Sequence, residues 1–520
     1  MQKYILIFFL LVSLSCDDLF HDDNNQYQVI DNQQKKIDIL NGIYARLVKV
    51  HDYSYFTALA RSDDVNIYTN YSFRYGDGIT WGGSCSASKS PGNDFGSITG
   101  NIYLNLYAAI INTNRLLLAL SETEDPAITG ELHFLRAYCY FKLARLFGTP
   151  PLIKDIDVNY LIKKPSYREV YEFIEEDMLK ALELLPDTYT DARIPGETPN
   201  KGTAKAMLAE IYLAMAGFPV NDNEKYAEAA RLAGEVIDQA DQYKYGLLDD
   251  LADLWKIKNR HNKETIFGLY FDPAGKGIKN TIGSIFPSAD NMYAGVVLYS
   301  EYNPEFKFYD KYPNNYRKYI SYVTGHYENT YYDTLKGEET GKKFILYASP
   351  LVNPCDFVDR VISQKWIDQD EFISNAYHYK DGWAVTLYLL RYAQTLLTYA
   401  EAKARSGGPD ASAYEAVNKV RRRANKLDIN APSKFDLPSN LTTGQFTDSV
   451  VWERAWELCN EPDGRWFDIV RLNMKDKLAD YRYPQDLILK VDPSILNEDW
   501  YFYLIPQEDR WLNPNFAENK

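Results

Sequence analysis

Two groups of neighbouring carboxylates are the residues of this chain that come nearest to a catalytic arrangement. Asp63 and Asp64 are adjacent at the start of an aromatic segment, and Asp368, Asp370 and Glu371 cluster much later in the chain. Hydrolysis of a glycosidic bond requires only a pair of carboxyl groups, one of them with a raised pKa. Nothing in the sequence around either group indicates a raised pKa. We therefore interpret them as solvated charge, partners of loop backbone, or polar contacts to a ligand.

Other catalytic signatures are absent from the sequence. The six histidines form no HExxH zinc motif, and the chain has neither a GxSxG nucleophile elbow nor a GxxxxGK[ST] phosphate loop. Apart from Cys16, the cysteines are widely spaced and form no CxxC pair, which argues against a metal or redox site. We expect Cys139 and Cys459 to be buried as small apolar residues, and spacing leaves open whether these or Cys85 and Cys355 form a disulfide. We predict no catalytic residue, no metal and no cofactor.

A glycine-rich segment, residues 68–100, carries aromatic side chains suited to ligand binding. It contains Tyr75 and Trp81, along with Tyr68, Tyr71 and Phe73. The C–H face of a sugar ring stacks on a flat aromatic ring, and its hydroxyl rim requires polar partners. Asp64, Asn66 and Arg74 supply such partners nearby. We predict Trp81 and Tyr75 as stacking platforms, with Asp64 as a polar contact.

A second group of aromatic residues follows in the region between about 245 and 383. Tyr293 is our further candidate for ligand contact, and other rings that would complete a binding surface are Tyr299, Trp366, Tyr379 and Trp383. Packing under its own loop remains the alternative for each of these rings.

The N-terminus has the parts of a secretory signal. Lys3 precedes an apolar run, residues 4–12, which is too short to span a bilayer because that takes roughly 20 residues. Small residues then lead to Cys16, as in a bacterial lipobox. We predict a signal peptide over 1–15, lipidation of Cys16, and a polar tether over 16–34. A cleaved signal with an incidental cysteine is the alternative, since Ser13 stands where a lipobox usually has leucine.

Composition restricts the class of partner. The 520-residue chain is 46% apolar and 25% charged, which is ordinary for a globular protein. Its formal net charge of −15 argues against nucleic acid as a binding partner, because nucleic acids bind to basic surfaces. The 43 tyrosines contribute to an aromatic content of 15%, which favours a binding surface without establishing one.

Apolar periodicity predicts helices on both sides of an irregular region. The predicted helices cover residues 101–120, 131–147, 167–185, 201–216 and 226–239. Small and large residues in them follow the spacing of tetratricopeptide (TPR) helical pairs, as do residues 396–400 with 413–420. We expect short strands at 268–271 and 344–347. The predicted fold is mainly α: a TPR-like scaffold, residues 35–245 and 385–520, around an inserted, loop-rich subdomain, residues 246–384.

Six segments in order along the chain resemble the signature motifs of one family, the SusD/RagB-like outer-membrane nutrient-binding lipoproteins of Bacteroidetes. They are ELHFLRAYCYFKLARLFGTPPLI (131–153), KGTAKAMLAEIYL (201–213), RYAQTLLTYAEA (391–402) with AVNKVRRRA (416–424), ERAWEL (453–458), RWFDIVR (465–471), and LIPQ (504–507) with NPN (513–515). The motifs themselves are interpreted as packing, and we expect Arg465 and Asp468 to tie helices together.

The resemblance implies a function. It implies a protein anchored by Cys16 on the outer face of the outer membrane, where it presents a nutrient, usually a glycan, to a SusC-like TonB-dependent transporter. Asp17 and Asp18 resemble the surface-export signal of such lipoproteins, and Trp81 falls in a loop that often carries a ligand-binding tryptophan. It implies no enzyme activity. The alternatives are a peptide-binding protein like the RagB branch, a surface glycosidase, and an assembly subunit without a ligand.

Overall fold

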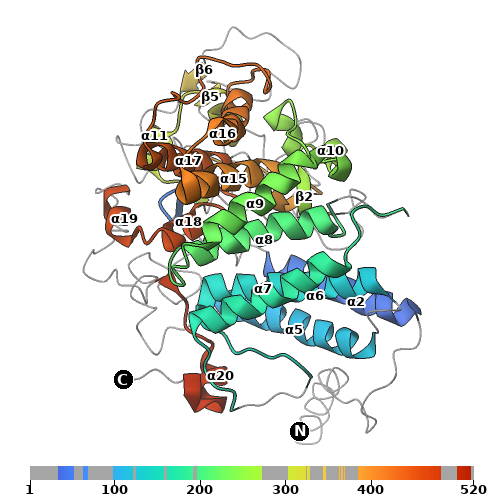
Figure 1. The fold of residues 1–520 in the computed structure, drawn as a ribbon. Coiled ribbons are helices and arrows are strands. Elements are labelled where there is room, and N and C mark those ends of the chain that lie inside the picture. Colours follow the sequence, from blue (N-terminus) through green and yellow to red (C-terminus); the bar gives the residue numbers. More distant parts are fainter. Residues whose placement is uncertain are drawn as a thin grey trace, which may run out of the picture.

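The computed structural model describes residues 33–51, 62–67, 98–120, 125–156, 161–190, 196–271, 302–323, 325–327, 344–346, 362–363, 365–366, 368, 384–481 and 501–516. Antiparallel helices that pack side by side dominate this part of the chain (Figure 1). Within the described residues, no helix is both long enough and apolar enough to cross a membrane.

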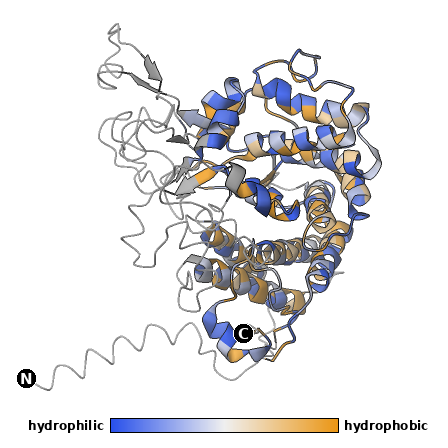
Figure 2. Ribbon diagram, turned by 90° about the vertical axis from the view of Figure 1, so that its left-hand side faces the viewer, coloured by the Kyte–Doolittle hydropathy of each residue, from blue (hydrophilic) through white to orange (hydrophobic). Residues whose placement is uncertain are grey.

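Helices of the first half form one continuous stack. Each packs on the next in the order α2, α5, α6, α7, α8 and α9. Their bounds are Gln33–Val50 (α2), Ile98–Ala119 (α5), Pro126–Phe147 (α6), Tyr167–Leu184 (α7), Lys201–Ala216 (α8) and Lys225–Asp238 (α9). Apolar residues run through the interior of this stack (Figure 2), and α6 and α8 are buried over most of their surface.

Capping residues explain where several helices begin. Ser166 accepts a hydrogen bond from the backbone N–H of Glu169, whose side chain accepts one in return from the Ser166 backbone, which starts α7. Asn200 and Thr203 form the same reciprocal arrangement at the start of α8. These capping boxes satisfy backbone donors that a helix leaves unpaired at its N-terminus.

The stack continues across the inserted region. Helix α9 packs against α15 (Tyr392–Gly407), although about 150 residues separate them in sequence. Helix α15 in turn contacts α16 (Ala411–Ala424) and α17 (Thr443–Leu458). The chain therefore leaves the scaffold after α9 and returns at α15, which confirms the predicted TPR-like pairs on both sides of an irregular region.

A two-stranded antiparallel sheet closes the base of this inserted region. Strand β2 (Thr265–Leu269) pairs with β8 (Leu387–Arg391), which runs directly into α15. The predicted strand at 268–271 overlaps β2, which begins three residues earlier, and the strand predicted at 344–347 is β6. Three short elements precede β2: α10 (Ala240–Tyr243), η3 (Leu251–Trp255) and η4 (Ile257–Asn259). Between β2 and β8 lie β3 (Tyr302–Pro304), α11 (Phe306–Lys311), α12 (Tyr316–Ser321), β4 (Tyr322–Val323), β5 (Gly325–Tyr327), β6 (Phe344–Leu346) and β7 (Ile362–Ser363).

The inserted strands form small ladders rather than one sheet. Strand β4 pairs with β7, β5 with β6, and β3 with β1 (Val65–Ile67) from the first half of the chain. After α17 the chain continues through α18 (Arg465–Arg471), α19 (Lys475–Tyr481), α20 (Gln507–Leu512) and η9 (Pro514–Phe516). Cys139 and Cys459 are free and buried, as expected from their positions.

Candidate ligand-binding site

A short ribbon joins the two regions from which ligand contacts are predicted. Strands β1 and β3 are antiparallel, with Val65 opposite Pro304 and Ile67 opposite Tyr302. Because of this register, the chain leaves β1 and enters β3 at the same end of the ribbon. The aromatic segment that starts at residue 68 and the inserted segment that ends at residue 301 therefore have their ends next to each other.

The predicted aromatic contacts belong to these two segments. Tyr75 and Trp81 follow β1, and Tyr293 precedes β3. All three lie outside the described residues, as do Tyr299, Tyr379 and Trp383. The position of the ribbon therefore shows where the segments that carry these three residues begin or end. Contact of their side chains with a ligand stays a prediction.

A buried ion pair holds the start of β1 on the helical scaffold. Arg465, the first residue of α18, donates from Nε to Asp63 Oδ1 at 2.8 Å and from Nη2 to Asp63 Oδ2 at 2.9 Å. Both side chains are almost fully buried. Asp468 of the same helix binds Arg454 and Arg471, so the prediction that this motif ties helices together is confirmed. Sequence reasoning missed Asp63 as the partner, since no local pattern connects it to Arg465.

Asp64 lies beneath the ribbon rather than on its surface. Its side chain is 3% exposed, and its carboxylate accepts hydrogen bonds from the Ser62 hydroxyl and from the Asn460 backbone N–H. Burial raises the pKa of Asp64 to about 6, and the charge of Asp63 adds to the rise. The structure thus gives Asp64 a supporting position, in place of the surface position that we expected for a ligand contact.

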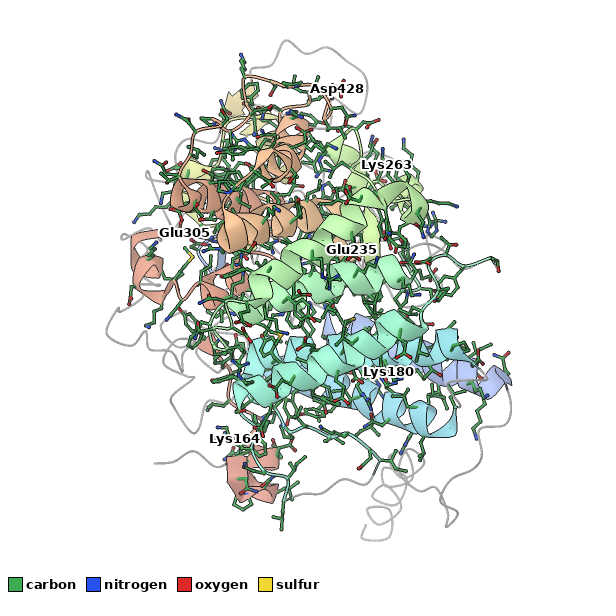
Figure 3. The ribbon with its side chains drawn as sticks, viewed as in Figure 1. Lys164, Lys180, Glu235, Lys263, Glu305 and Asp428 are labelled. Atoms are coloured by element: carbon green, nitrogen blue, oxygen red, sulfur yellow. The ribbon has the colours of Figure 1, made fainter. Side chains whose placement is uncertain are left out.

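Glu305, which directly follows β3, binds Asp64 at the start of β1 and was not predicted from the sequence. Its backbone N–H donates to the Asp64 carbonyl oxygen at 3.1 Å, directly after β3. Its buried carboxylate accepts from the backbone N–H groups of Lys307 and Phe308, at 2.8 and 3.3 Å, and so caps α11. Glu305 is labelled in Figure 3. An acid preceding a short helix is the local signal that would have indicated this cap.

The turn after α17 supports the same region from below. Asn460 has a left-handed backbone with φ of 58°, and its carbonyl oxygen accepts from Trp366 Nε1 at 2.8 Å. Lys365 Nζ donates to the carbonyl oxygens of Glu457 and Cys459, at 2.8 and 2.9 Å. The Trp366 side chain is fully buried, so the expectation that it completes a ligand surface is wrong. It faces the interior because this turn offers its indole N–H a buried acceptor.

Glu457 of α17 centres a charge network that attaches the inserted region to the scaffold. It accepts hydrogen bonds from Arg391 of β8 and Arg317 of α12, both at 2.7 Å, and from Arg423 of α16 at 2.6 Å. Burial alone raises the pKa of Glu457, but these guanidinium groups outweigh it and hold that pKa well below its usual value. Glu264, next to β2, also binds Arg391 and Arg423. Opposite charges therefore compensate one another in the buried network that joins α12 and β8 to α16 and α17.

The acids considered for catalysis have structural partners where the structure describes them. Asp63 is paired with Arg465, and Asp368 accepts from the Ile257 backbone N–H at 2.7 Å and is buried. Asp370 and Glu371 lie outside the described residues. Among the described residues no group of histidine, cysteine and acidic side chains is arranged to hold a metal ion.

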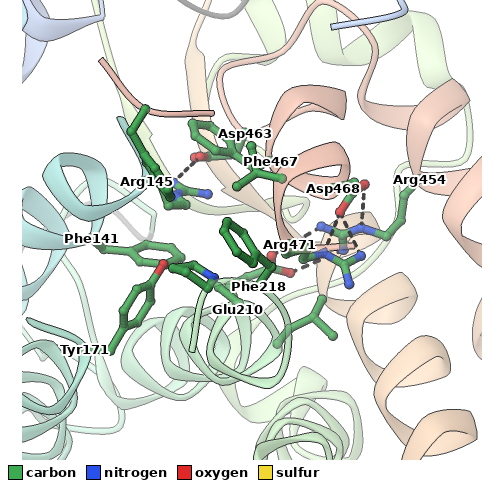
Figure 4. Close-up of a pocket in the computed structure, with 15 residues that line it drawn as sticks. Phe141, Arg145, Tyr171, Glu210, Phe218, Arg454, Asp463, Phe467, Asp468 and Arg471 are labelled. Carbon is green, nitrogen blue, oxygen red and sulfur yellow. Dashed lines mark hydrogen bonds and ion pairs between the residues drawn. The ribbon is translucent and has the colours of Figure 1, made fainter. Parts of the chain in front are cut away.

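A small internal cavity lies where α6, α7, α8, α17 and α18 meet. Figure 4 shows Arg145 with Asp463 on one side of it, and Arg454, Asp468 and Arg471 on the other. Its volume of about 30 Å³ has room for water molecules, whereas small-molecule sites measure roughly 300–1,000 Å³. This cavity is a gap in the helix packing and is too small for a sugar ring.

A larger hollow of about 490 Å³ opens between α7 and the two segments 152–154 and 162–165. Lysine and glutamate side chains dominate its lining: Lys154, Lys163, Lys164, Glu169, Glu172 and Glu176. Phe173 is the aromatic residue among the described ones that line it, and Lys154 Nζ lies 4.7 Å from the centre of its ring. A cation thus already occupies a ring face that a sugar would need.

Comparison with known proteins agrees with this architecture. Residues 255–520 match the model of the SusD family, and residues 20–213 match a SusD-like model described as starch-binding and associating with the outer membrane. SusD-like protein P2 of Formosa agariphila is 26% identical over 406 residues, which cover 74% of each chain. A SusD-like protein of Bacteroides ovatus is 24% identical over 73% of this chain and 66% of its own.

Solved structures share the fold. A SusD homologue from Bacteroides thetaiotaomicron superposes with a TM-score of 0.74 at 24% identity, covering 94% of this chain and 97% of its own. A laminarin-binding SusD-like protein gives a TM-score of 0.65 at 21% identity, covering 93% and 98%. A structure with a xylogluco-oligosaccharide gives 0.69 at 20% identity, covering 92% and 98%. Since the SusD family model alone spans half of the chain, this protein belongs to the SusD family.

Proposed function

We propose that this protein captures oligosaccharide at the cell surface and delivers it to a SusC-like TonB-dependent transporter. The observation that carries the proposal is the β1–β3 ribbon, which brings together the ends of the segments that hold Trp81 and Tyr293. A sugar that stacks on aromatic rings from both segments would be held by parts of the chain far apart in sequence. Tyr75 is a second stacking platform, and Asp64 supports the segment from below.

Membership of the SusD family supports this ligand class, since solved structures of the same fold include a laminarin-binding SusD-like protein and a structure with a xylogluco-oligosaccharide. The second model description, starch-binding and associated with the outer membrane, supports the location. We propose that residues 1–15 are a signal peptide and that Cys16 carries the acyl chains that tether the protein to the outer face of that membrane. Incorporation of labelled palmitate, abolished in Cys16→Ser, tests the anchor.

Calorimetric titration with a panel of soluble glycans tests the ligand class. Starch, laminarin and xyloglucan oligosaccharides are the first probes. We expect one class to bind, and Trp81→Ala to weaken binding by about tenfold or more, the loss typical of a central stacking residue. Trp511→Ala is the matched control, because Trp511 is an exposed tryptophan of α20, which lies at the lower border of the molecule in Figure 1, apart from α18, the helix that holds the start of β1.

The same preparation distinguishes the other candidate functions. Binding of peptides in place of glycans would identify the ligand class of the RagB-like alternative. Release of new reducing ends from a bound glycan would identify an enzyme, whereas we propose that the glycan stays intact. Absence of binding to either panel would contradict the proposed function.

A further inference from the structure

Two adjacent buried carboxylates meet a single guanidinium group where β1 is attached to the scaffold. Asp63 is 1% exposed and Asp64 is 3% exposed. Both hydrogen bonds from Arg465, at 2.8 and 2.9 Å, go to the carboxylate oxygens of Asp63. The Asp64 carboxylate accepts from two neutral donors instead, the hydroxyl of Ser62 and the backbone N–H of Asn460. Among the described residues no cation is bonded to Asp64, so an ionised Asp64 has no counter-charge of its own.

The other elements that pack around Asp64 do not supply that charge. The hydroxyl of Tyr322 in β4 and the thiol of Cys459 interact with Asp64, and burial raises the pKa of both groups, so they stay uncharged. Glu305 contributes a backbone N–H to the Asp64 carbonyl oxygen, while its own carboxylate caps α11. Lys365 donates to three oxygen atoms of the turn after α17. The surroundings of Asp64 therefore favour its neutral form.

The attachment of β1 is therefore tightest when Asp64 is protonated. Burial raises the pKa of this carboxyl from 3.8 to about 6, and the charge of Asp63 adds to the rise. If the start of β1 separates from the scaffold, water reaches the carboxyl group and its pKa returns toward the usual value. Separation therefore becomes easier as the pH rises from about 4 to about 6, and it depends little on pH above that range.

The ribbon depends on this attachment because it is short. Strands β1 and β3 form three residue pairs, and an isolated two-stranded ribbon is marginally stable at best in water. Helix α8 of the scaffold is, by contrast, buried over most of its surface. Opening at the start of β1 disrupts few contacts, so it costs less free energy than unfolding of the scaffold.

We propose that Asp64 is a pH-sensitive latch for the β1–β3 ribbon. Its protonated carboxyl holds the start of β1 against the turn after α17, and loss of the proton favours local opening at this point. The opening equilibrium rises by about tenfold for each pH unit over the range in which the attached and the separated states differ in protonation. Between pH 4.5 and pH 7.5 the rise is roughly thirtyfold.

Hydrogen exchange measured by mass spectrometry tests the latch without any ligand. Peptides that cover residues 62–67 and 302–305 report on the ribbon, because the Glu305 backbone N–H donates to the Asp64 carbonyl oxygen. Peptides from α8 report on the scaffold. Wild type and Asp64→Asn are compared at pH 4.5 and pH 7.5, with correction for the intrinsic exchange rates of unstructured chain. Asp448→Asn, at an exposed position of α17, is the matched control.

We expect the ribbon peptides to exchange well before those of α8 at pH 7.5. From pH 4.5 to pH 7.5 their protection in wild type should fall roughly thirtyfold relative to Asp64→Asn, because asparagine does not ionise. Asp448→Asn should behave as wild type. In Asp63→Asn the Arg465 guanidinium becomes available to Asp64 as a counter-charge, so most of the pH dependence should disappear.

Three results would overturn the latch. The first is the same pH dependence of the ribbon peptides in wild type and Asp64→Asn, and the second is a full pH dependence in Asp63→Asn. The third is exchange of the ribbon and α8 at one rate, since β1 would then separate only when the whole protein unfolds. No glycan is present in this experiment, so its outcome is independent of the proposed function.

Discussion

Arg465 and Asp63, which are 402 positions apart in the chain, form a two-point ion pair beneath the β1–β3 ribbon. Through this pair the start of β1 is fixed to α18 of the C-terminal scaffold. Asp63→Asn leaves the Arg465 guanidinium buried without the carboxylate that it binds at two points, and loss of one partner of a buried pair typically costs about 3–5 kcal/mol. We therefore expect a loss of that size in the free energy of unfolding, measured with urea.

A matched surface pair is the control for this measurement. Arg168 and Asp222 form an ion pair in which the Arg168 side chain is half exposed. Asp222→Asn should cost less than about 1 kcal/mol because water screens such pairs. An equally small effect of Asp63→Asn would show that the buried pair does not hold the ribbon.

Asp64 gives the stability of the fold a specific pH dependence. Burial raises its pKa from 3.8 to about 6 in the folded protein, so the folded state favours the protonated carboxyl. This contribution to stability is fully present below the unfolded pKa and is lost as the pH rises through about 6. We expect Asp64→Asn to gain about 2 kcal/mol relative to wild type between roughly pH 4.5 and pH 7.5. Unfolding at the two pH values measures this gain.

Asp463 has a lowered pKa, in contrast to Asp64, and is the comparison in the same unfolding assay. Although burial raises its pKa, Arg145 and Lys142 outweigh that effect and lower it to about 2. The contribution of its charge is present above the unfolded pKa and is lost only as the pH falls through about 2, so Asp463 itself stays ionised at both pH values. A pH dependence of Asp463→Asn would therefore report its partner Lys142, whose pKa burial lowers to about 7. If the effect of Asp64→Asn is the same at pH 4.5 and pH 7.5, the assigned pKa of Asp64 is contradicted.

Substitution of two glycines by alanine distinguishes the cost of a steric clash from the gain in helix propensity. A Cβ atom on Gly217, at the end of α8, would lie 2.2 Å from the carbonyl oxygen of Arg471 in α18, and a backbone atom cannot move aside cheaply. Gly217→Ala should therefore lower the free energy of unfolding by about 1–3 kcal/mol or more. Gly444, in the first turn of α17, has nothing within 4 Å of its Cβ position. Gly444→Ala should be neutral or stabilising by up to about 1 kcal/mol. Equal effects of the two substitutions in thermal unfolding would contradict the tight α8–α18 contact.

Local patterns predicted the helices well where a helix has its own start and stop signals. The bounds of α8 are those predicted, because Asn200 and Thr203 cap its start and Gly217 follows its end. The α15–α16 pair was also predicted, from small residues at helical spacing around Ala400 and Val417. Such signals involve residues a few positions apart, so a single sequence contains them.

The candidate site was harder to predict because its supports come from distant parts of the chain. Trp366 stands among polar loop residues and looked accessible, but its acceptor is the carbonyl oxygen of Asn460, which follows it by 94 positions. Asp64 is likewise enclosed by Glu305 and Asn460, which are distant in sequence, so the residues around Asp64 did not indicate that it is buried. The residues that stack on a ligand remain a prediction from their types and from the ribbon that joins their segments.

The most direct test of the central claim is a glycan titration of Trp81→Ala, Tyr293→Ala and the double variant. If the ribbon brings both segments to one ligand, each single substitution weakens binding by about tenfold, and the double variant binds more weakly than either. Full affinity in Tyr293→Ala, alongside a loss in Trp81→Ala, would contradict a site shared by the two segments. Unchanged affinity in all three variants would contradict the site itself.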